Sequence, residues 1–292
     1  MIKTAIVTDS NAGILPEEVQ GKGIFIVPMP FLVNDELYFE NVNLSQAEFY
    51  TLLQSNASVS TSQPSLGDLT DTWTEILKDY DEIVHIPMSS GLSQSCASAQ
   101  MWAKDFGGKV HVVDNHRISV TLKTSVYEAA KLREEGKSAE EIKAYLESTC
   151  ADASIYIAVD TMKYLKKGGR ITPAAAAIGS ILRLKPILSL QGERLDKYAI
   201  ARSQSKAKEI MKEAIAKDLK GRLQPLAEKG ELCLCVAHSN CEEDAKEFVK
   251  ELQAYFPNTP IAYRDPISLS VACHLGPGAL AVTAGRYVKS AL

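Results

Sequence analysis

The sequence has little that points to a membrane, a secretory route or a nucleic acid. No uninterrupted apolar run reaches the roughly 20 residues that a transmembrane helix needs. Segment 1–10 lacks the long apolar core and the small-residue cleavage site of a signal peptide. The net charge of −4 argues against a general nucleic-acid binder. These absences predict a cytoplasmic protein with no nucleic-acid partner.

Nucleotide and metal motifs are also missing. Neither Gly-x-x-x-x-Gly-Lys-Ser/Thr nor Gly-x-Gly-x-x-Gly occurs, so we expect no ATP or dinucleotide site in this chain. The six cysteines are expected to be reduced in the cytoplasm. Cys233, Cys235, His238 and Cys241 lie close together, but their spacing matches no common zinc pattern. Cys233 and Cys235 alternate along an apolar run that predicts a strand with small buried side chains. We therefore expect no metal and no cofactor.

Length and element order predict two α/β domains, residues 1–155 and 156–292. In the first, apolar β-branched runs alternate with helical patterns, which is typical of a Rossmann-like, mostly parallel sheet. In the second, Pro186–Leu190 and Tyr198–Arg202 flank a short polar turn and predict an antiparallel hairpin, hence a mixed sheet. Strands are expected at Thr4–Val7, Ile24–Val33, Glu82–Pro87, Lys109–Asp114, Ile155–Asp160, Leu232–Ala237, Ile261–Tyr263 and Ala279–Ala284, and Leu37–Val42 either pairs back or runs over the surface.

Helix starts are marked by serines with the chemistry of a helix cap. Ser45 and Ser138 are each followed three residues later by Glu, which is the capping-box pattern. Ser65 is expected to cap a third helix. Helices are expected at Pro16–Gln20, after Ser45 to Leu53, Leu66–Lys78, Ser93–Lys104, Ser119–Glu135, after Ser138 to Ser148, Ala174–Leu182, Ser205–Lys220 and Cys241–Ala254.

Hydroxyl-rich segments lie just before two of these helices. Ser89–Ser93 follows a buried strand and precedes a helix, and open α/β sheets bind ligands beyond the carboxyl ends of their strands. A helix start there offers unpaired N–H groups to an anion, and Ser93 adds a hydroxyl. Thr61–Ser65 has the same arrangement. The alternatives are that Ser93 only caps its helix and that Thr61–Ser65 is an ordinary connection.

Three further candidates are isolated charged or titratable side chains. Arg170 follows Gly168 and Gly169, which permit a tight turn that aims the arginine at a fixed point. His274 opens the segment His274–Gly278, where glycines on both sides of a proline predict a defined turn. Asp9 ends the first strand and is a weaker site candidate. Alternatively, Arg170 neutralises helix carbonyls or a nearby Asp, His274 faces solvent, and Asp9 caps a turn.

The combination of these motifs, from Thr8-Asp9-Ser10 to the Gly-Pro-Gly turn, resembles the DegV family. Its better-known members are the fatty-acid-binding subunits of bacterial fatty acid kinase. The resemblance implies a long-chain fatty acid buried between the two domains with its carboxylate near the surface. It makes Thr61, Ser62, Ser93 and His274 ligands of the carboxylate, and it places Arg170 near the partner or the phosphate. Arg202, which ends the second strand of the predicted hairpin, is a further candidate for contact with the partner. Where the family usually continues with Gly-Thr and an aromatic after Ser93, this chain has Gln94-Ser95-Cys96.

The resemblance also implies a role without catalysis in this chain. The protein would present the bound carboxylate to a separate ATP-binding kinase subunit, which forms the acyl phosphate, and transient contact with a membrane surface is compatible with that role. Two alternatives stay open. One is a serine hydrolase using Ser93, His274 and an acid such as Asp9, although the second glycine of the nucleophile elbow is missing. The other is a lipid sensor that serves no kinase.

Overall fold

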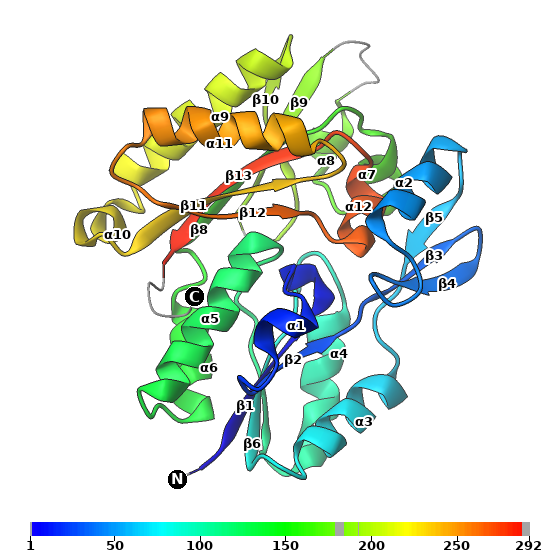
Figure 1. Cartoon of the computed structure of the whole chain (residues 1–292), viewed down its shortest axis with the longest axis vertical. Helices are drawn as coiled ribbons and strands as arrows, with labels where there is room; N and C mark the ends of the chain where they lie inside the picture. The colour runs from blue at the N-terminus through cyan, green and yellow to red at the C-terminus, as the bar shows by residue number, and fades with distance from the viewer. Residues whose placement is uncertain (1, 179–183, 192, 288–292) are drawn as a thin grey trace.

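The computed structural model describes residues 2–178, 184–191 and 193–287 (Figure 1). The first half contains a four-stranded parallel sheet in the order β2-β1-β6-β7. Alternate residues of β1 face opposite layers, because successive side chains of a strand point to opposite faces. Ala5 and Val7 pack with α3 and α4, whereas Ile6 packs with α5 and α6. The bounds are β1 Thr4–Asp9, β2 Ile24–Val27, β6 Glu82–Ile86, β7 Val110–Val112, α1 Pro16–Val19, α3 Leu66–Ile76, α4 Ser95–Trp102, α5 Val120–Glu134 and α6 Ala139–Ser148.

A small three-stranded sheet, in the order β4-β3-β5, projects from this half (Figure 1). Asn34 and Asp35 both have positive φ and form the tight turn between β3 and β4, which suits a twisted hairpin. Of the two alternatives that the sequence left open for Leu37–Val42, pairing back holds, with β4 antiparallel to β3, but the sequence did not separate this sheet from the parallel one. The bounds are β3 Pro30–Val33, β4 Glu36–Phe39, β5 Val59–Thr61 and α2 Gln46–Gln54.

The second half is a six-stranded mixed sheet in the order β10-β9-β8-β13-β11-β12, and within it only β11 and β12 run parallel. The predicted hairpin of β9 and β10 and the predicted mixed sheet are confirmed. Cys233 and Cys235 lie buried on one face of β11, as expected. The bounds are β8 Ala153–Ala158, β9 Lys185–Leu190, β10 Asp196–Ala201, β11 Leu232–His238, β12 Ile261–Pro266, β13 Leu280–Arg286, α9 Gln204–Lys220, α10 Gln224–Lys229 and α11 Glu242–Tyr255.

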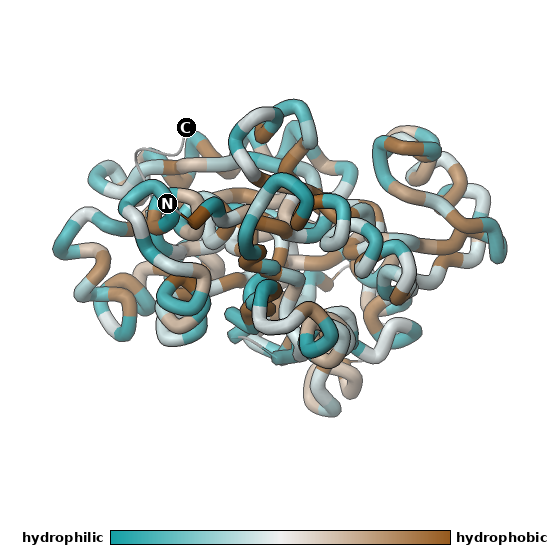
Figure 2. The backbone as a smooth tube through the Cα atoms, turned by 90° about the horizontal axis from the view of Figure 1, so that it is seen from below, coloured by the Kyte–Doolittle hydropathy of each residue, from teal (hydrophilic) through white to brown (hydrophobic). Residues whose placement is uncertain are grey.

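The two faces of this sheet have different neighbours. Helices α9 and α11 lie over one face, where Met211 and Phe248 pack on Leu234 and Val236 (Figure 1). The other face joins Ile157, Leu188 and Ala237 to the core of the first half. Brown, hydrophobic stretches of the backbone in Figure 2 accordingly run through the interior, and teal ones mark many of the outer turns. The second sheet therefore presents an apolar face to the carboxyl ends of the first.

Several helix boundaries differ from the sequence prediction. The capping boxes at Ser45 and Ser138 and the cap at Ser65 are confirmed. The helix expected from Ser93 begins at Ser95, because the Ser93 hydroxyl accepts from the Ser95 N–H at 3.2 Å and closes a local turn instead. Ser93 therefore does not cap a helix that starts next to it.

The helix expected at Ala174–Leu182 is only partly within the described residues. There it covers Pro173–Ala176 (α8), and residues 179–182 lie outside the described residues. Ala175 is its only buried member, so the alanines contribute good helix propensity but too little apolar surface to hold a longer helix. The sequence also missed four described elements: β5, α10, α7 (Lys163–Gly168) and α12 (Leu269–Leu275).

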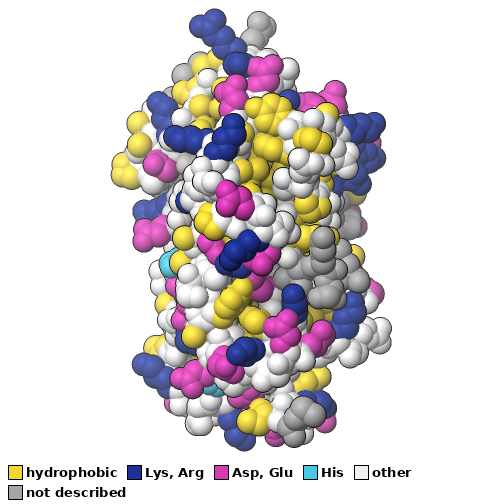
Figure 3. All heavy atoms as spheres, turned by 90° about the vertical axis from the view of Figure 1, so that its left-hand side faces the viewer, with side chains coloured by type: hydrophobic (Ala, Val, Ile, Leu, Met, Phe, Trp, Pro, Cys, Tyr) yellow, Lys and Arg dark blue, Asp and Glu magenta, His cyan; other side chains and the backbone are white. Residues whose placement is uncertain are grey.

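The described surface carries charges of both signs. Figure 3 shows one face on which lysine and arginine side chains are interspersed with aspartate and glutamate. Many are i,i+3 or i,i+4 pairs along helices, for example Lys137 with Glu141 at 3.0 Å. Within the described residues, no helix is both long and apolar enough to cross a bilayer.

Candidate functional site

A cavity of about 580 Å³ lies between the mixed sheet and the loops at the carboxyl ends of β2, β6 and β7. Its floor is one face of the sheet. Ile155 pairs with Leu190 of β9 on one side and with Thr283 of β13 on the other, and Ile157 pairs with Ala281. These five side chains share a face because residues two apart on a strand point the same way. Met29, Met88, Leu92 and Ile118 line the opposite side. Most of the lining is therefore apolar.

Polar groups gather at one end of this cavity. Ser62, Gln63, Gln94 and Ser98 line it there, and Ser62 and Gln94 are exposed to solvent. The Ser98 hydroxyl donates to Gln63 Oε1 at 3.0 Å, which ties the loop after β5 to α4. This end is the mouth of the cavity, and the segments predicted to contact an anion form its rim.

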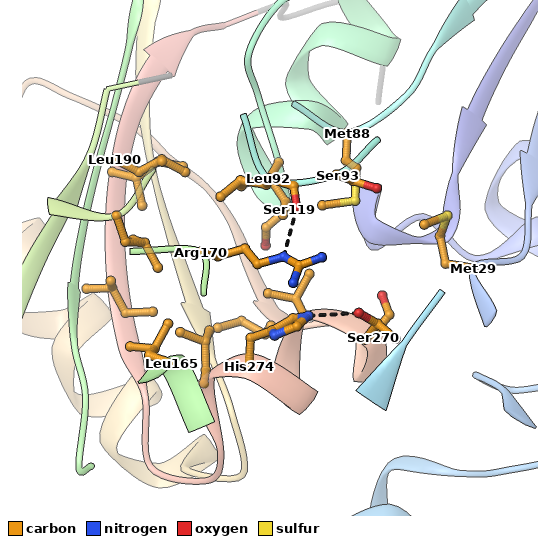
Figure 4. A pocket seen from close by; sticks show the side chains of 18 of the residues that line it. Met29, Met88, Leu92, Ser93, Ser119, Leu165, Arg170, Leu190, Ser270 and His274 are labelled. Carbon is orange, nitrogen blue, oxygen red and sulfur yellow. Dashed lines mark hydrogen bonds between the residues drawn. The ribbon is translucent and has the colours of Figure 1, made fainter. Parts of the chain in front are cut away.

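Thr61 and His274 meet just inside the mouth. Thr61 Oγ1 lies 2.9 Å from His274 Nε2, and both residues line the cavity. Figure 4 shows His274 beside Arg170. Thr61 ends β5, whereas His274 lies in the last turn of α12. The turn predicted around Pro277 is present, with positive φ at Gly276 and Gly278, but His274 precedes it and belongs to the helix, which ends at Leu275. Thr61 and His274 are 213 residues apart in sequence and form one polar pair.

The His274 imidazole is neutral at physiological pH. Burial lowers its pKa to about 4, and the positive charge of Arg170 lowers it further in the same direction. A neutral ring donates from one nitrogen and accepts at the other. The pair of His274 and Thr61 can therefore hydrogen-bond to a third group without adding a charge to the site.

Arg170 reaches into the same end of the cavity from the α7 side. Its Nε donates to the Leu92 carbonyl at 3.2 Å, and its guanidinium also donates to the carbonyl of Gly168, the last residue of α7 (Figure 4). Arg170 thus donates to a helix carbonyl, as one of the alternatives for this residue had it. Its described hydrogen bonds go to neutral carbonyls, so its charge is available to a ligand in the cavity.

The glycines around this site have different physical roles. Gly169 has φ +68° and ends α7 in the left-handed conformation, as expected for a tight turn. Gly168 instead permits close packing: a Cβ there would lie 2.2 Å from His274 Nδ1. A Cβ at Gly276 would meet the Tyr164 ring at 2.4 Å, and one at Gly91 would meet Glu193 Cα at 2.3 Å. Glycine at these three positions lets α7, α12 and the β9–β10 loop close around the cavity.

The remaining candidates are placed less centrally. Ser93 is half-buried and lines the cavity, and Ser62 lines it while donating to its neighbour's carbonyl, Gln63 O, at 3.1 Å. Arg202 is exposed directly after β10 and is not among the cavity residues. The structure therefore brings together Thr61, Ser62, Ser93, Arg170 and His274, but not Arg202.

Asp9 has a structural role. Its carboxylate accepts from the Met88 N–H at 2.7 Å and the Asn11 N–H at 3.0 Å, and burial raises its pKa to about 6. It therefore fixes the loop that carries Met88 into the cavity. His274 contacts Thr61, and Asp9 is engaged with backbone amides, so Ser93, His274 and Asp9 do not form the hydrogen-bonded series that a catalytic triad needs.

Sequence reasoning missed most of the apolar lining and part of the rim. Gln63 stands inside the Thr61–Ser65 motif but was not singled out, and Ser270 lies on a helix that the sequence did not reveal. The alternation of Ile155 and Ile157 along β8 was the one signal for the floor. This alternation identifies a buried sheet face, but it does not distinguish a cavity from a fully packed core.

The pKa of His274 leads to a testable pH dependence. The folded-state pKa of about 4 lies below the ordinary value of about 6.5, so the unfolded chain binds more protons between these pH values. Stability therefore falls as pH drops from about 6.5 toward 4, and His274 contributes a loss on the order of 3 kcal/mol. Replacing His274 with Gln should remove this part of the loss. Urea unfolding of both proteins across that pH range measures the free energy of unfolding. The same pH dependence of this free energy in both proteins would contradict the expectation.

Comparison with known proteins fits this arrangement. A sequence model of the family described as "Uncharacterised protein, DegV family" matches residues 3–286. The chain belongs to the DegV family. A DegV domain-containing protein of Streptococcus pneumoniae is 30% identical over 283 residues, covering 97% of this chain and 98% of that one. Another from Deinococcus radiodurans is 35% identical over 204 residues, covering 70% and 73%.

Solved DegV structures share the whole fold. A DegV family protein from Thermus thermophilus, described by its fatty acid binding, is 28% identical with a TM-score of 0.89, covering 98% of this chain and all of that one. DegV from Bacillus subtilis, described as a fatty acid binding protein, is 29% identical with a TM-score of 0.84 and the same coverage. The two-sheet arrangement around the cavity is thus the DegV fold.

Proposed function

We propose that this DegV protein binds one long-chain fatty acid in the cavity, with the carboxylate at the mouth and the acyl chain along the sheet. The observation that carries the proposal is the division of one 580 Å³ cavity into an apolar floor and a polar end. A volume of this size is in the range of small-molecule sites, about 300–1,000 Å³. The fatty acid binding of the Thermus thermophilus and Bacillus subtilis relatives supports the same ligand class.

The energetics favour an acyl chain over a polar ligand in this cavity. Each buried methylene contributes about 0.8 kcal/mol, so a long chain contributes on the order of 10 kcal/mol before association costs are subtracted. A carboxylate left unpaired would offset much of that gain. The hydroxyls of Thr61, Ser62 and Ser93 and the neutral His274 supply the hydrogen bonds to the carboxylate. A neutral histidine suits this task, because it adds a donor without needing a second anion.

We further propose that the protein is a carrier and not an enzyme, and that it presents the carboxylate to a separate ATP-binding kinase subunit. The polar end lies at the mouth, where a partner has access to the carboxylate, and the exposed Arg202 is available for contact with that partner. The division into domains 1–155 and 156–292, with the ligand between them, belongs to the same proposal. It is supported by the change from the parallel sheet to the mixed sheet between β7 and β8. A cytoplasmic location fits this role.

Ligand extraction tests the first step. Native mass spectrometry of the purified protein should show an added mass that solvent extraction releases as a long-chain fatty acid, at about one molecule per chain. The stoichiometry follows from a single apolar floor leading to a single polar end. A protein that retains a sugar or nucleotide instead, or that binds no added fatty acid after delipidation, would overturn the proposal.

A further inference from the structure

A second, smaller hollow adjoins the floor of the cavity. Its volume is about 80 Å³, and it shares two walls with the main cavity, the side chains of Ile155 and Leu190. We call it the annex. This pair of residues thus lies between the main cavity and the annex.

The register of β8 defines where the annex begins. Ala153, Ile155 and Ile157 point to the same face, because they are two residues apart on one strand. Ile157 lines only the main cavity, Ala153 lines only the annex, and Ile155 lines both. Leu190 is the partner of Ile155 on β9, so the two side chains lie directly opposite each other across the strands. This cross-strand pair forms a partition.

The annex differs from the main cavity in its chemistry. Arg117 is only 1% exposed and lines the annex, together with His116, Gln191 and Arg222. Two guanidinium nitrogens of Arg117 donate to Ser125 Oγ at 2.9 Å and to the Thr149 carbonyl at 2.8 Å. Its Nε has no hydrogen-bond partner among the described residues. Buried polar groups therefore form part of the lining of the annex.

We propose that the Ile155–Leu190 pair is the end wall of the acyl site and sets the longest chain that the protein accepts. The inference rests on the proposed function. An acyl chain lies along Ile157, Ala281 and Thr283 and stops at Ile155, because the side chains of Ile155 and Leu190 stand between the main cavity and the annex. Chain-length selection is thus assigned to a cross-strand pair at the edge of the floor, far in sequence from the residues at the mouth.

Two isoleucines on the same face of β8 provide a matched test. Ile155→Ala removes the partition and joins the annex to the cavity, whereas Ile157→Ala removes the same atoms from the middle of the floor. A ladder of saturated fatty acids of increasing even length is offered to each delipidated protein, and retention is read by native mass spectrometry. The longest chain retained by Ile155→Ala should increase by about two carbons, since 80 Å³ corresponds to two or three water-sized volumes of about 30 Å³. Ile157→Ala should bind all lengths more weakly with no change in that limit.

The reverse substitution makes the test independent of a loss of packing. Ile155→Phe extends the wall into the cavity and should shorten the longest retained chain. Thermal unfolding of each variant establishes that it is folded before binding is measured. An unchanged limit in Ile155→Ala, or equal shifts in Ile155→Ala and Ile157→Ala, would overturn the end wall while wild-type binding stands. A wild-type protein that retains no chain of any length would instead refute the proposed function.

Discussion

Replacing Gly168 with alanine is expected to weaken fatty acid binding by about tenfold to a hundredfold. The new Cβ would lie 2.2 Å from His274 Nδ1, so the imidazole must move away from Thr61. Hydrogen bonds to a charged group contribute about 1.5–3 kcal/mol, and one decade of affinity corresponds to about 1.4 kcal/mol. Displacement of a fluorescent fatty acid from the delipidated protein measures the loss.

Gly169→Ala is the matched control for this substitution. Gly169 has φ +68°, so alanine there is strained by about 1 kcal/mol, but no atom lies within 4 Å of the added Cβ. We therefore expect Gly169→Ala to lower stability and leave affinity nearly unchanged. Gly168→Ala should instead lower the affinity for the fatty acid, because its added Cβ clashes with His274. Equal loss of affinity in both variants would show that the turn, and not the position of His274, governs binding.

Arg170→Ala is expected to reduce kinase-dependent acyl-phosphate formation by about a hundredfold to a thousandfold, the range found when one preorganised transition-state donor is removed. Lipid binding should change little, because the buried chain supplies most of the affinity. Turnover is expected to fall because Arg170 is the cation at the polar end. Its described hydrogen bonds go to carbonyls, which leave its charge unneutralised. Turnover with the kinase subunit and fatty acid binding are measured on the same preparation.

Two further variants separate the charge from the contacts. Arg170→Gln removes the charge but retains an amide donor for the Leu92 or Gly168 carbonyl, so it should lose turnover as severely as Arg170→Ala. Arg202→Ala changes an exposed residue outside the cavity and should raise the carrier concentration needed for half-maximal rate. Loss of bound lipid in Arg170→Gln would show that the charge holds the ligand and does not act on the transferred phosphate.

The local features that the sequence predicted correctly are those in which neighbouring residues determine the outcome. The capping boxes at Ser45 and Ser138, for example, depend on contacts three residues apart. The buried face of β11 follows from alternation along a single strand. Errors arose where local patterns were weak. The alanines after Pro173 have helix propensity but little apolar surface, and α12 was hidden by the Gly-Pro-Gly segment that follows it.

The candidate site divides in the same way. Thr61, Ser93, Arg170 and His274 stand in motifs that the printed sequence displays, and the DegV resemblance selected them. Their mutual arrangement depends on packing between segments up to 213 residues apart, which no local pattern encodes. Gly168 is the clearest case: its sequence context indicated a flexible turn, whereas its contact with His274 exists only because α12 packs against α7.

By itself, the sequence determined most of the strands and helices, three of the helix caps, the mixed second sheet and the motifs that mark the DegV family. Only the tertiary structure decided that a cavity exists between the two halves, that Ile155 and Leu190 lie between it and the annex, and that a neutral histidine faces a threonine at its mouth. The physical reason is that caps and strand patterns are short-range properties of the chain. Cavities and shifted pKa values arise from how surfaces far apart in sequence fit together, and from what remains unfilled between them.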